Sequence, residues 1–218
     1  METDNTLLDR YILRQTQKEE PAVCFLPTAS GDSEGYIGSF YAAFEAFRCR
    51  PSHLSLFNLP SKDLEGLILA NDVVYVGGGN SRSMLALWRE WSIDTILRKA
   101  WEQGVVLAGI SAGSVCWFEE AISDFFPGEL NKLKCLGFLP GSNCPHYDGE
   151  PNRRPVYKRM ISGGELAPGI AADDGVALHY SGTELLRVVS SRPHARAWAV
   201  SRNASLTERE IVPDYLGG

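Results

Sequence analysis

Two segments constrain the fold of this chain most, because each reads as a buried strand that ends in very small residues. The first is DVVYVGGGNSRS at residues 72–83, and the second is VVLAGISAGS at residues 105–114. A strand that runs straight into glycines exposes backbone N–H groups at its carboxyl end, and the second segment adds a serine hydroxyl there. Acyl-transfer chemistry uses this geometry.

Strand-like and helix-like runs alternate through the first half of the chain. The pattern predicts strands at residues 22–26, 53–59, 72–76 and 105–111, and helices at 36–47, 61–70 (with Ser61 as cap), 84–100 and from 114 onward. Such alternation indicates an α/β fold whose parallel sheet is covered by helices on both faces. Residues 175–180, 184–190 and 196–201 are expected to be further strands, in an antiparallel extension. Ligands of such sheets bind beyond the carboxyl ends of the strands, where both glycine-rich segments lie.

The rest of the chain excludes several classes of protein. The 218 residues contain no repeat or linker, so one domain is expected over residues 1–218. A net charge of −6 without a Lys/Arg run argues against nucleic-acid and membrane partners. The charged amino terminus does not resemble a signal peptide, which favours the cytoplasm. Five scattered cysteines without CxxC spacing argue against disulfides and structural zinc, and we expect neither metal nor cofactor.

Ser111 is the candidate nucleophile. Residues 109–113, GISAG, match the G-x-S-x-G pattern, in which small neighbours let the chain turn sharply from strand to helix and project the serine. The alternative is a tight turn in which Ser111 only caps a helix. The apolar strand before the pattern and the expected helix after it favour the nucleophile.

The run GGGN at residues 77–80 is the candidate oxyanion hole. Here the N–H groups of Gly78 and Gly79, together with that of Ala112 after the serine, are expected to converge on a developing negative charge. Asn80, which closes the run, is a candidate for substrate binding. A phosphate or dinucleotide loop is the alternative, although the run lacks both the G-x-G-x-x-G spacing and the lysine of a P-loop.

A serine nucleophile needs a base, and the chain holds four histidines. His146 lies in the turn-rich loop GSNCPHYDG, where a base can reach a serine at a strand end, and it is the preferred candidate. His53 and His179 fall in expected strands and His194 in a turn, so structural or solvated roles are expected for these three.

The carboxylate that orients the histidine is left open by the residues alone. Asp124, Asp148, Asp173 and Asp174 are all candidates, and acidic residues in loops are more often simply solvated. Asp174 stands out because an Asp-Gly step before an apolar run places a carboxylate at the edge of a strand.

Three motifs in this order, YVGGGN, GISAGS and NCPHYDG, resemble the family of peptidase E (aspartyl dipeptidase) and cyanophycinase, with similarity over residues 23–201. The resemblance implies a class I glutamine amidotransferase-like fold, a flavodoxin-like three-layer arrangement with a mostly parallel sheet between helices. It implies that Ser111 is the nucleophile, His146 the base, and Gly78, Gly79 and Ala112 the oxyanion hole. Asp124 and Asp174 both match acids of the family, and we favour Asp174.

The resemblance also suggests a substrate. Peptidase E cleaves dipeptides with amino-terminal aspartate, and Arg154 corresponds to an arginine of that enzyme that would suit a carboxylate. The alternative is that Arg153 and Arg154 are both solvated. Ser114 and the run YDGEP differ from peptidase E, which is consistent with a sister subgroup that has another substrate.

The sequence thus predicts a cytoplasmic serine peptidase that acts on short peptides. The family often forms dimers, so a homodimer is expected, and Trp88, Trp91, Trp101 and Trp117 belong either to an interface or to the core. One alternative is an α/β-hydrolase esterase, in which His179 or His194 would be the base. Another is a binder of small molecules without catalytic activity on the same scaffold.

Overall fold

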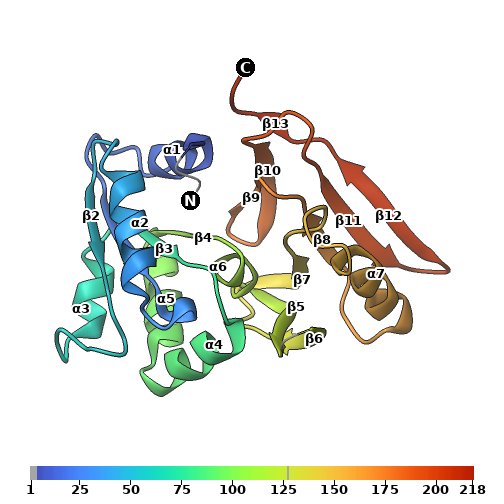
Figure 1. Cartoon of the computed structure of the whole chain (residues 1–218), viewed down its shortest axis with the longest axis horizontal. Helices are drawn as coiled ribbons and strands as arrows, with labels where there is room; N and C mark the ends of the chain where they lie inside the picture. Colours follow the sequence, from blue (N-terminus) through green and yellow to red (C-terminus); the bar gives the residue numbers. More distant parts are fainter. Residues whose placement is uncertain (1–3, 127) are drawn as a thin grey trace. The chain divides into compact units, whose positions relative to one another are not determined.

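The computed structural model describes residues 4–126 and 128–218 (Figure 1). Its contacts divide the chain into two compact units, Met1–Ser114 and Val115–Gly218, and each unit is described by itself. The single domain that the sequence predicts over residues 1–218 stays a prediction.

The first unit is built on a four-stranded parallel sheet with strand order β2-β1-β3-β4. Its strands are β1 (Ala22–Leu26), β2 (Arg50–His53), β3 (Val73–Val76) and β4 (Val106–Gly109). Its helices are α1 (Leu7–Arg14), the 3-10 turn η1 (Thr28–Ser30), α2 (Glu34–Phe44), α3 (Leu64–Leu69), α4 (Ser81–Glu90), α5 (Ile93–Glu102) and α6 (Ala112–Val115), which runs one residue past the boundary of the unit.

Both faces of this sheet are covered, because β1 and β3 are buried along their whole length. On one face Phe25 of β1 stacks on Phe40 of α2 with ring centroids 4.7 Å apart. Side chains alternate along a strand, so Leu26 points to the opposite face, and it is fully buried as well. Buried side chains of α3, α4 and α5, among them Trp88, are available to cover that face. This is the helix-covered parallel sheet that the sequence predicts.

Three local predictions for this unit are wrong. The second strand ends at His53, where it was expected to begin. The helix expected at residues 84–100 is two helices, because Ser92 adopts the left-handed conformation (φ 55°) between α4 and α5. Asp63, not Ser61, caps α3, since the Asp63 carboxylate accepts a hydrogen bond from the N–H of Gly66 at 2.8 Å.

The second unit contains two sheets and one long helix. The six-stranded sheet has the order β12-β11-β8-β7-β5-β6 and the three-stranded sheet the order β13-β10-β9. The strands are β5 (Phe118–Phe126), β6 (Glu129–Lys134), β7 (Leu139–Cys144), β8 (Gly169–Ala172), β9 (Val176–Ser181), β10 (Glu184–Ser190), β11 (Ala197–Arg202), β12 (Leu206–Ile211) and β13 (Asp214–Tyr215), and the helix is α7 (Arg153–Gly163).

Strands β5, β7 and β8 pair in parallel, and antiparallel strands extend the sheet on either side of them. Helix α7 packs Tyr157, Met160 and Ile161 onto the six-stranded sheet. The expected antiparallel pairing of residues 175–180 with 184–190 is observed between β9 and β10. Over the described residues, parallel pairs outnumber antiparallel ones, so the α/β fold with mostly parallel strands is confirmed.

The helix expected from residue 114 onward is wrong. Helix α6 ends at Val115, and Phe118–Phe126 forms β5. The apolar residues Phe118, Ala121 and Ile122 have helical spacing and are buried, but they are buried by a strand. Pairing of β5 with β6 and β7 overrides the local pattern, because strand pairing depends on residues far along the chain.

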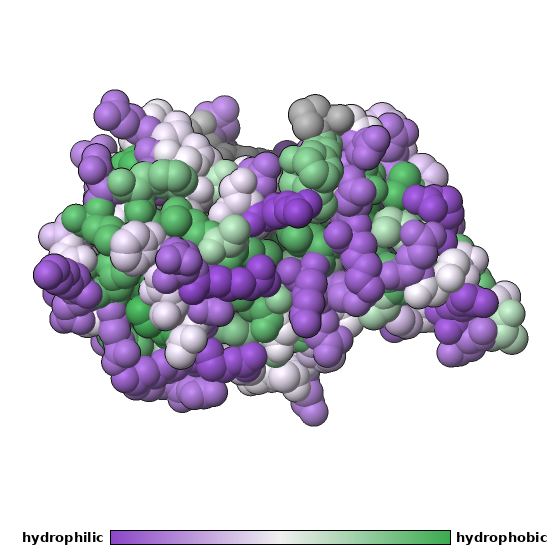
Figure 2. Space-filling model, turned by 90° about the horizontal axis from the view of Figure 1, so that it is seen from below, coloured by the Kyte–Doolittle hydropathy of each residue, from purple (hydrophilic) through white to green (hydrophobic). Residues whose placement is uncertain are grey.

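The surface mixes polar and apolar side chains, as the face drawn in Figure 2 shows. Exposed large apolar residues come from several elements and include Phe57, Leu186 and Val212. Of the tryptophans weighed as interface or core, Trp88 and Trp117 are buried and Trp91 is exposed. None of the described helices has the length and apolar character needed to cross a membrane.

Candidate active site

Ser111 lies in a sharp turn between β4 and α6. Its φ is +55°, the left-handed region, which costs a residue with a side chain about 1 kcal/mol or more and therefore needs support from its surroundings. The two glycines of GISAG provide that support. A Cβ on Gly109 would lie 2.2 Å from the carbonyl oxygen of Gly113, and a Cβ on Gly113 would lie 2.2 Å from that of Val76. The G-x-S-x-G pattern is thus a steric requirement of this turn.

The structure brings the glycine run beside Ser111. Strands β3 and β4 are neighbours in register, with Val76 opposite Gly109, so the segments that follow them leave the same edge of the sheet. A Cβ on Gly78 would lie 3.2 Å from Cβ and 3.8 Å from Oγ of Ser111. A larger residue at position 78 would therefore crowd the hydroxyl.

The three expected oxyanion donors differ in their present bonding. The N–H of Gly78 donates to the hydroxyl of Tyr36 at 3.1 Å. Burial raises the pKa of Tyr36, which keeps this hydroxyl protonated. Among the described residues, none accepts a hydrogen bond from the N–H of Gly79 or Ala112. The role of Gly78, Gly79 and Ala112 as an oxyanion hole stays a prediction.

His146 and Asp174 meet in the second unit. They follow β7 and β8, which pair in parallel with Cys144 opposite Ala171. His146 Nδ1 lies 2.6 Å from Asp174 Oδ1. An ionised carboxylate only accepts hydrogen bonds, so Nδ1 carries the proton and donates it. The imidazole is thereby held in the tautomer that leaves Nε2 as an acceptor.

Two neighbours hold Asp174 in place. The backbone N–H of Asp174 donates to Asp148 Oδ1 at 2.8 Å. Gly149 leaves room for the carboxylate, since a Cβ on Gly149 would lie 2.6 Å from Asp174 Oδ2. Asp148, weighed above as an acid for the histidine, thus contacts the main chain of Asp174.

Asp124, the other acid implied by the resemblance, has a different partner. It lies on β5 with 59% of its side chain exposed, and its Oδ1 is 3.5 Å from Nη2 of Arg153. Arg153 is buried and also donates from Nε to Glu150 at 2.6 Å. Of the two acids, the geometry joins Asp174 to His146.

The two candidate substrate residues both have internal partners. The side chain of Asn80 caps α4, accepting a hydrogen bond from the N–H of Ser83 at 2.9 Å. Arg154 donates from Nε and Nη2 to the carboxylate of Glu208 at 3.1 and 2.8 Å, and 43% of its side chain is exposed. The alternative of a solvated side chain is wrong for Arg153, which is buried, whereas Arg154 is partly exposed and paired with Glu208. Substrate binding by Asn80 or Arg154 stays a prediction.

Several residues of this region were not singled out from the sequence. Tyr36 appeared only as an apolar position of a helix, and Gly149 only as part of a turn. Glu208 lies on β12, far along the chain from every motif, so no local signal pointed to it. Only the alternation of polar residues in LTEREI marks its strand.

Comparisons with known proteins show the family of this chain. The pattern of peptidase family S51 matches residues 1–188. The uncharacterized peptidase YgaJ of Bacillus subtilis (strain 168) is 55% identical over 218 residues, covering 100% of this chain and 94% of that protein.

Two solved structures share the fold. One is a peptidase from an acI-B1 actinobacterium, with TM-score 0.69 and 18% identity over 95% of this chain and 89% of that one. The other is a candidate peptidase E protein from Listeria monocytogenes EGD-e, with TM-score 0.54 and 17% identity over 92% of this chain and 93% of that one. At these identities the two structures show the fold alone. The family is shown by the match of the family pattern to residues 1–188 and by the 55% identity to YgaJ. The chain therefore belongs to peptidase family S51.

Proposed function

We propose that this peptidase is a serine peptidase that hydrolyses short peptides through an acyl-enzyme. The observation that carries the proposal is the conformation of Ser111, held in a left-handed turn at the carboxyl end of β4 with Gly78 beside its hydroxyl. Strained turns of this kind occur where a serine is presented to a substrate.

In the proposed reaction His146 acts as the general base. The Asp174 carboxylate holds Nδ1–H at 2.6 Å, so Nε2 is the ring nitrogen that accepts the proton of Ser111. The serine oxygen then attacks the peptide carbonyl, and the N–H groups of Gly79 and Ala112 stabilise the oxyanion. We assign Gly78 to the same hole once a carbonyl oxygen replaces the Tyr36 hydroxyl.

The tetrahedral intermediate then collapses: the peptide C–N bond breaks, and the protonated His146 gives its proton to the leaving amine, which completes the acyl-enzyme. In the second half of the reaction His146 removes a proton from a water molecule, and the water oxygen attacks the acyl-enzyme. The ester bond to Ser111 breaks, the carboxylic acid leaves, and the hydroxyl is restored.

The family match favours this peptidase over the other two functions considered. An esterase of the α/β-hydrolase type would take His179 or His194 as its base, and His179 lies within β9, where burial lowers its pKa. A binder without catalytic activity would leave the strained turn at Ser111 and the His146–Asp174 pair unexplained. We also propose a cytoplasmic location and a homodimer. Light scattering on the purified protein tests the homodimer.

For substrates, we propose a preference for dipeptides that begin with aspartate. A charged hydrogen bond to that side chain contributes about 1.5–3 kcal/mol, so kcat/KM should be about 10–100-fold higher for Asp-Leu than for the matched Asn-Leu. The measurement is a dipeptide panel that varies only the first residue. Equal rates for Asp-Leu and Asn-Leu would remove the aspartate preference and leave the peptidase in place.

A further inference from the structure

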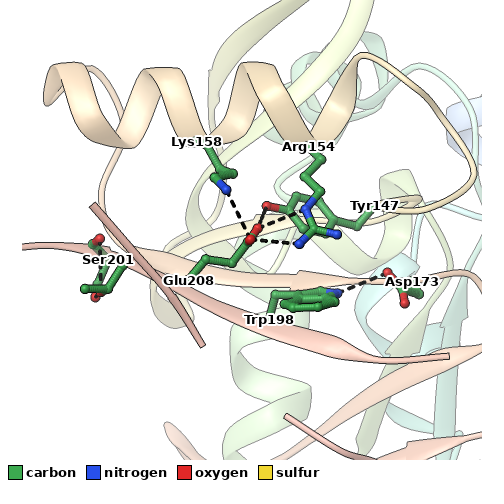
Figure 3. A network of polar contacts seen from close by, with 8 residues as sticks. Tyr147, Arg154, Lys158, Asp173, Trp198, Ser201 and Glu208 are labelled. Atoms are coloured by element: carbon green, nitrogen blue, oxygen red, sulfur yellow. Dashed lines mark hydrogen bonds and ion pairs between the residues drawn. The ribbon is translucent and has the colours of Figure 1, made fainter. Parts of the chain in front are cut away.

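The His146–Asp174 pair joins two loops, and both loops are fixed to one polar cluster in the second unit. We define the Glu208 cluster as Tyr147, Arg154, Lys158, Asp173, Trp198 and Glu208 (Figure 3). Tyr147 directly follows His146, and Asp173 directly precedes Asp174. Trp198 and Glu208 lie outside residues 1–188, the part matched by the family pattern.

Glu208 is the centre of this cluster, and only 12% of its side chain is exposed. Its Oε1 accepts hydrogen bonds from the hydroxyl of Tyr147 at 2.6 Å and from Nε of Arg154 at 3.1 Å. Its Oε2 accepts from Nη2 of Arg154 at 2.8 Å and from Nζ of Lys158 at 3.1 Å. Burial raises the pKa of Glu208, but these hydrogen bonds outweigh it and lower the pKa from 4.5 to about 2.

The cluster continues from Glu208 to Asp173. The guanidinium carbon of Arg154 lies 5.2 Å from the ring centroid of Tyr147 and 4.2 Å from that of Trp198, so the two rings hold the group that binds Glu208. Trp198 Nε1 then donates to Asp173 Oδ1 at 3.3 Å. A connected path therefore runs from the residue after His146 to the residue before Asp174.

The main chain of both loops is tied to the same region. The N–H of Tyr147 donates to the carbonyl of Ala172 at 3.1 Å. Asp173 exchanges hydrogen bonds with the main chain of Arg196, donating its N–H to the carbonyl and accepting the N–H at Oδ2, both at 2.9 Å. His146 itself has a left-handed φ of 56°, which persists only where the surroundings enforce it.

From these contacts we infer that Glu208 is a positioning residue: through Tyr147, Arg154 and Trp198 it fixes the two loops so that His146 and Asp174 stay hydrogen-bonded. The inference rests on the proposed function for its catalytic consequence. It gives Arg154 a role inside the protein in place of contact with the substrate, so the proposed preference for aspartate takes its charged hydrogen bond from another residue.

The test is Glu208→Gln, which keeps the shape of the side chain and removes its charge. Changes in residues that support a catalytic group lower activity by about 10–100-fold, so we expect kcat to fall by that factor on every dipeptide while KM stays within about 2-fold. Proton NMR of the parent protein should show the hydrogen-bonded Nδ1 proton of His146 far downfield, and its loss in His146→Ala assigns it. In Glu208→Gln this signal should broaden or disappear.

Asp214→Asn is the matched control. It breaks another arginine–carboxylate pair of the same unit, formed by Nε and Nη2 of Arg187 at 3.2 and 2.7 Å, and that pair is exposed. This variant should keep the parental kcat and the downfield proton.

If Glu208→Gln does not fold, Trp198→Phe is the second test. It keeps a ring over Arg154 and removes the hydrogen bond to Asp173, and it is expected to lower kcat and broaden the same proton.

A stability measurement checks that Glu208 acts through its charge. Because the folded pKa of Glu208 is below its ordinary value, its contribution to stability is present above pH 4.5 and is lost as the pH falls toward 2. The Tm of Glu208→Gln should therefore lie below that of the parent at pH 7, and the difference should shrink between pH 4.5 and pH 2.

Three results would overturn the positioning role. One is a folded Glu208→Gln protein with parental kcat and an unchanged Nδ1 proton. Another is an Asp214→Asn protein whose downfield proton changes as strongly as that of Glu208→Gln. A third is an Arg154→Ala protein whose KM rises for Asp-Leu and for no other dipeptide, which would assign Arg154 to the substrate. A parent protein without peptidase activity would defeat the proposed function instead, and the NMR comparison would still decide the positioning role.

Discussion

Ser111→Ala should lower kcat for peptide hydrolysis by about 10⁴-fold or more, because removal of a triad nucleophile leaves only the oxyanion hole and substrate binding to act. The physical reason is local. The Ser111 hydroxyl is presented in a left-handed turn beside Gly78, and no other described hydroxyl is expected to take its place there. The measurement is kcat on the best dipeptide, with KM determined in parallel.

Folding should survive this change. Alanine has the same Cβ as serine and adopts the same turn at similar cost, so the free energy of unfolding should change by less than about 1 kcal/mol. Ser114→Ala, three residues further in the same short helical turn, is the matched control and should retain activity. A purified Ser111→Ala protein that cleaves peptides at the parental rate would exclude Ser111 as nucleophile.

Asp174→Asn is expected to have the second-largest effect, a loss of about 10³–10⁴-fold in kcat. In place of an oxygen that accepts the Nδ1 proton of His146 at 2.6 Å, the variant offers an amide, which can present N–H groups and favour the tautomer with the proton on Nε2. That tautomer cannot accept the proton of Ser111. Its kcat should fall across the whole dipeptide panel, with little change in KM.

Asp124→Asn serves as the paired variant, since both carboxylates are implied by the family resemblance. Asp124 is exposed and pairs with Arg153, and exposed ion pairs contribute at most about 1 kcal/mol. This variant should keep kcat within about 3-fold of the parent, a change worth less than 1 kcal/mol. The reverse result, a large loss for Asp124→Asn and a small one for Asp174→Asn, would move the acid to Asp124.

The sequence predicts best those features whose cause lies in neighbouring residues. The buried strands around Val23 and Val74 are continuous apolar runs, and the turn at Ser111 needs its two glycines because the backbone packs within contact distance there. In each case the cause lies within a few residues, so the local pattern is sufficient.

The features that the sequence does not predict depend on distant partners. The segment Phe118–Phe126 has helical spacing but becomes a strand by pairing with β6 and β7. The left-handed break at Ser92 carries no glycine or proline to mark it. Local propensity is overridden in both places by packing that forms only in the folded chain.

The candidate site divides in the same way. Ser111 and His146 could be named from motifs, and the sequence already favoured Asp174, but the hydrogen bond between His146 and Asp174 depends on the pairing of β7 with β8. Glu208 could not be named at all, because its role follows from the meeting of β12 with α7 and with the loop after β7. Residues that position a site are found by their contacts more than by their type.

The central claim is that Ser111 and His146 act on one carbonyl group. An aminoacyl chloromethyl ketone with a free amino group tests it, because the serine oxygen adds to its carbonyl while the histidine nitrogen displaces chloride and becomes alkylated. Mass spectrometry of peptides from the treated protein should find the modification on His146 in the parent and lose it in Ser111→Ala. Alkylation of His179 or His194 instead, or of His146 at the same rate without Ser111, would contradict the account.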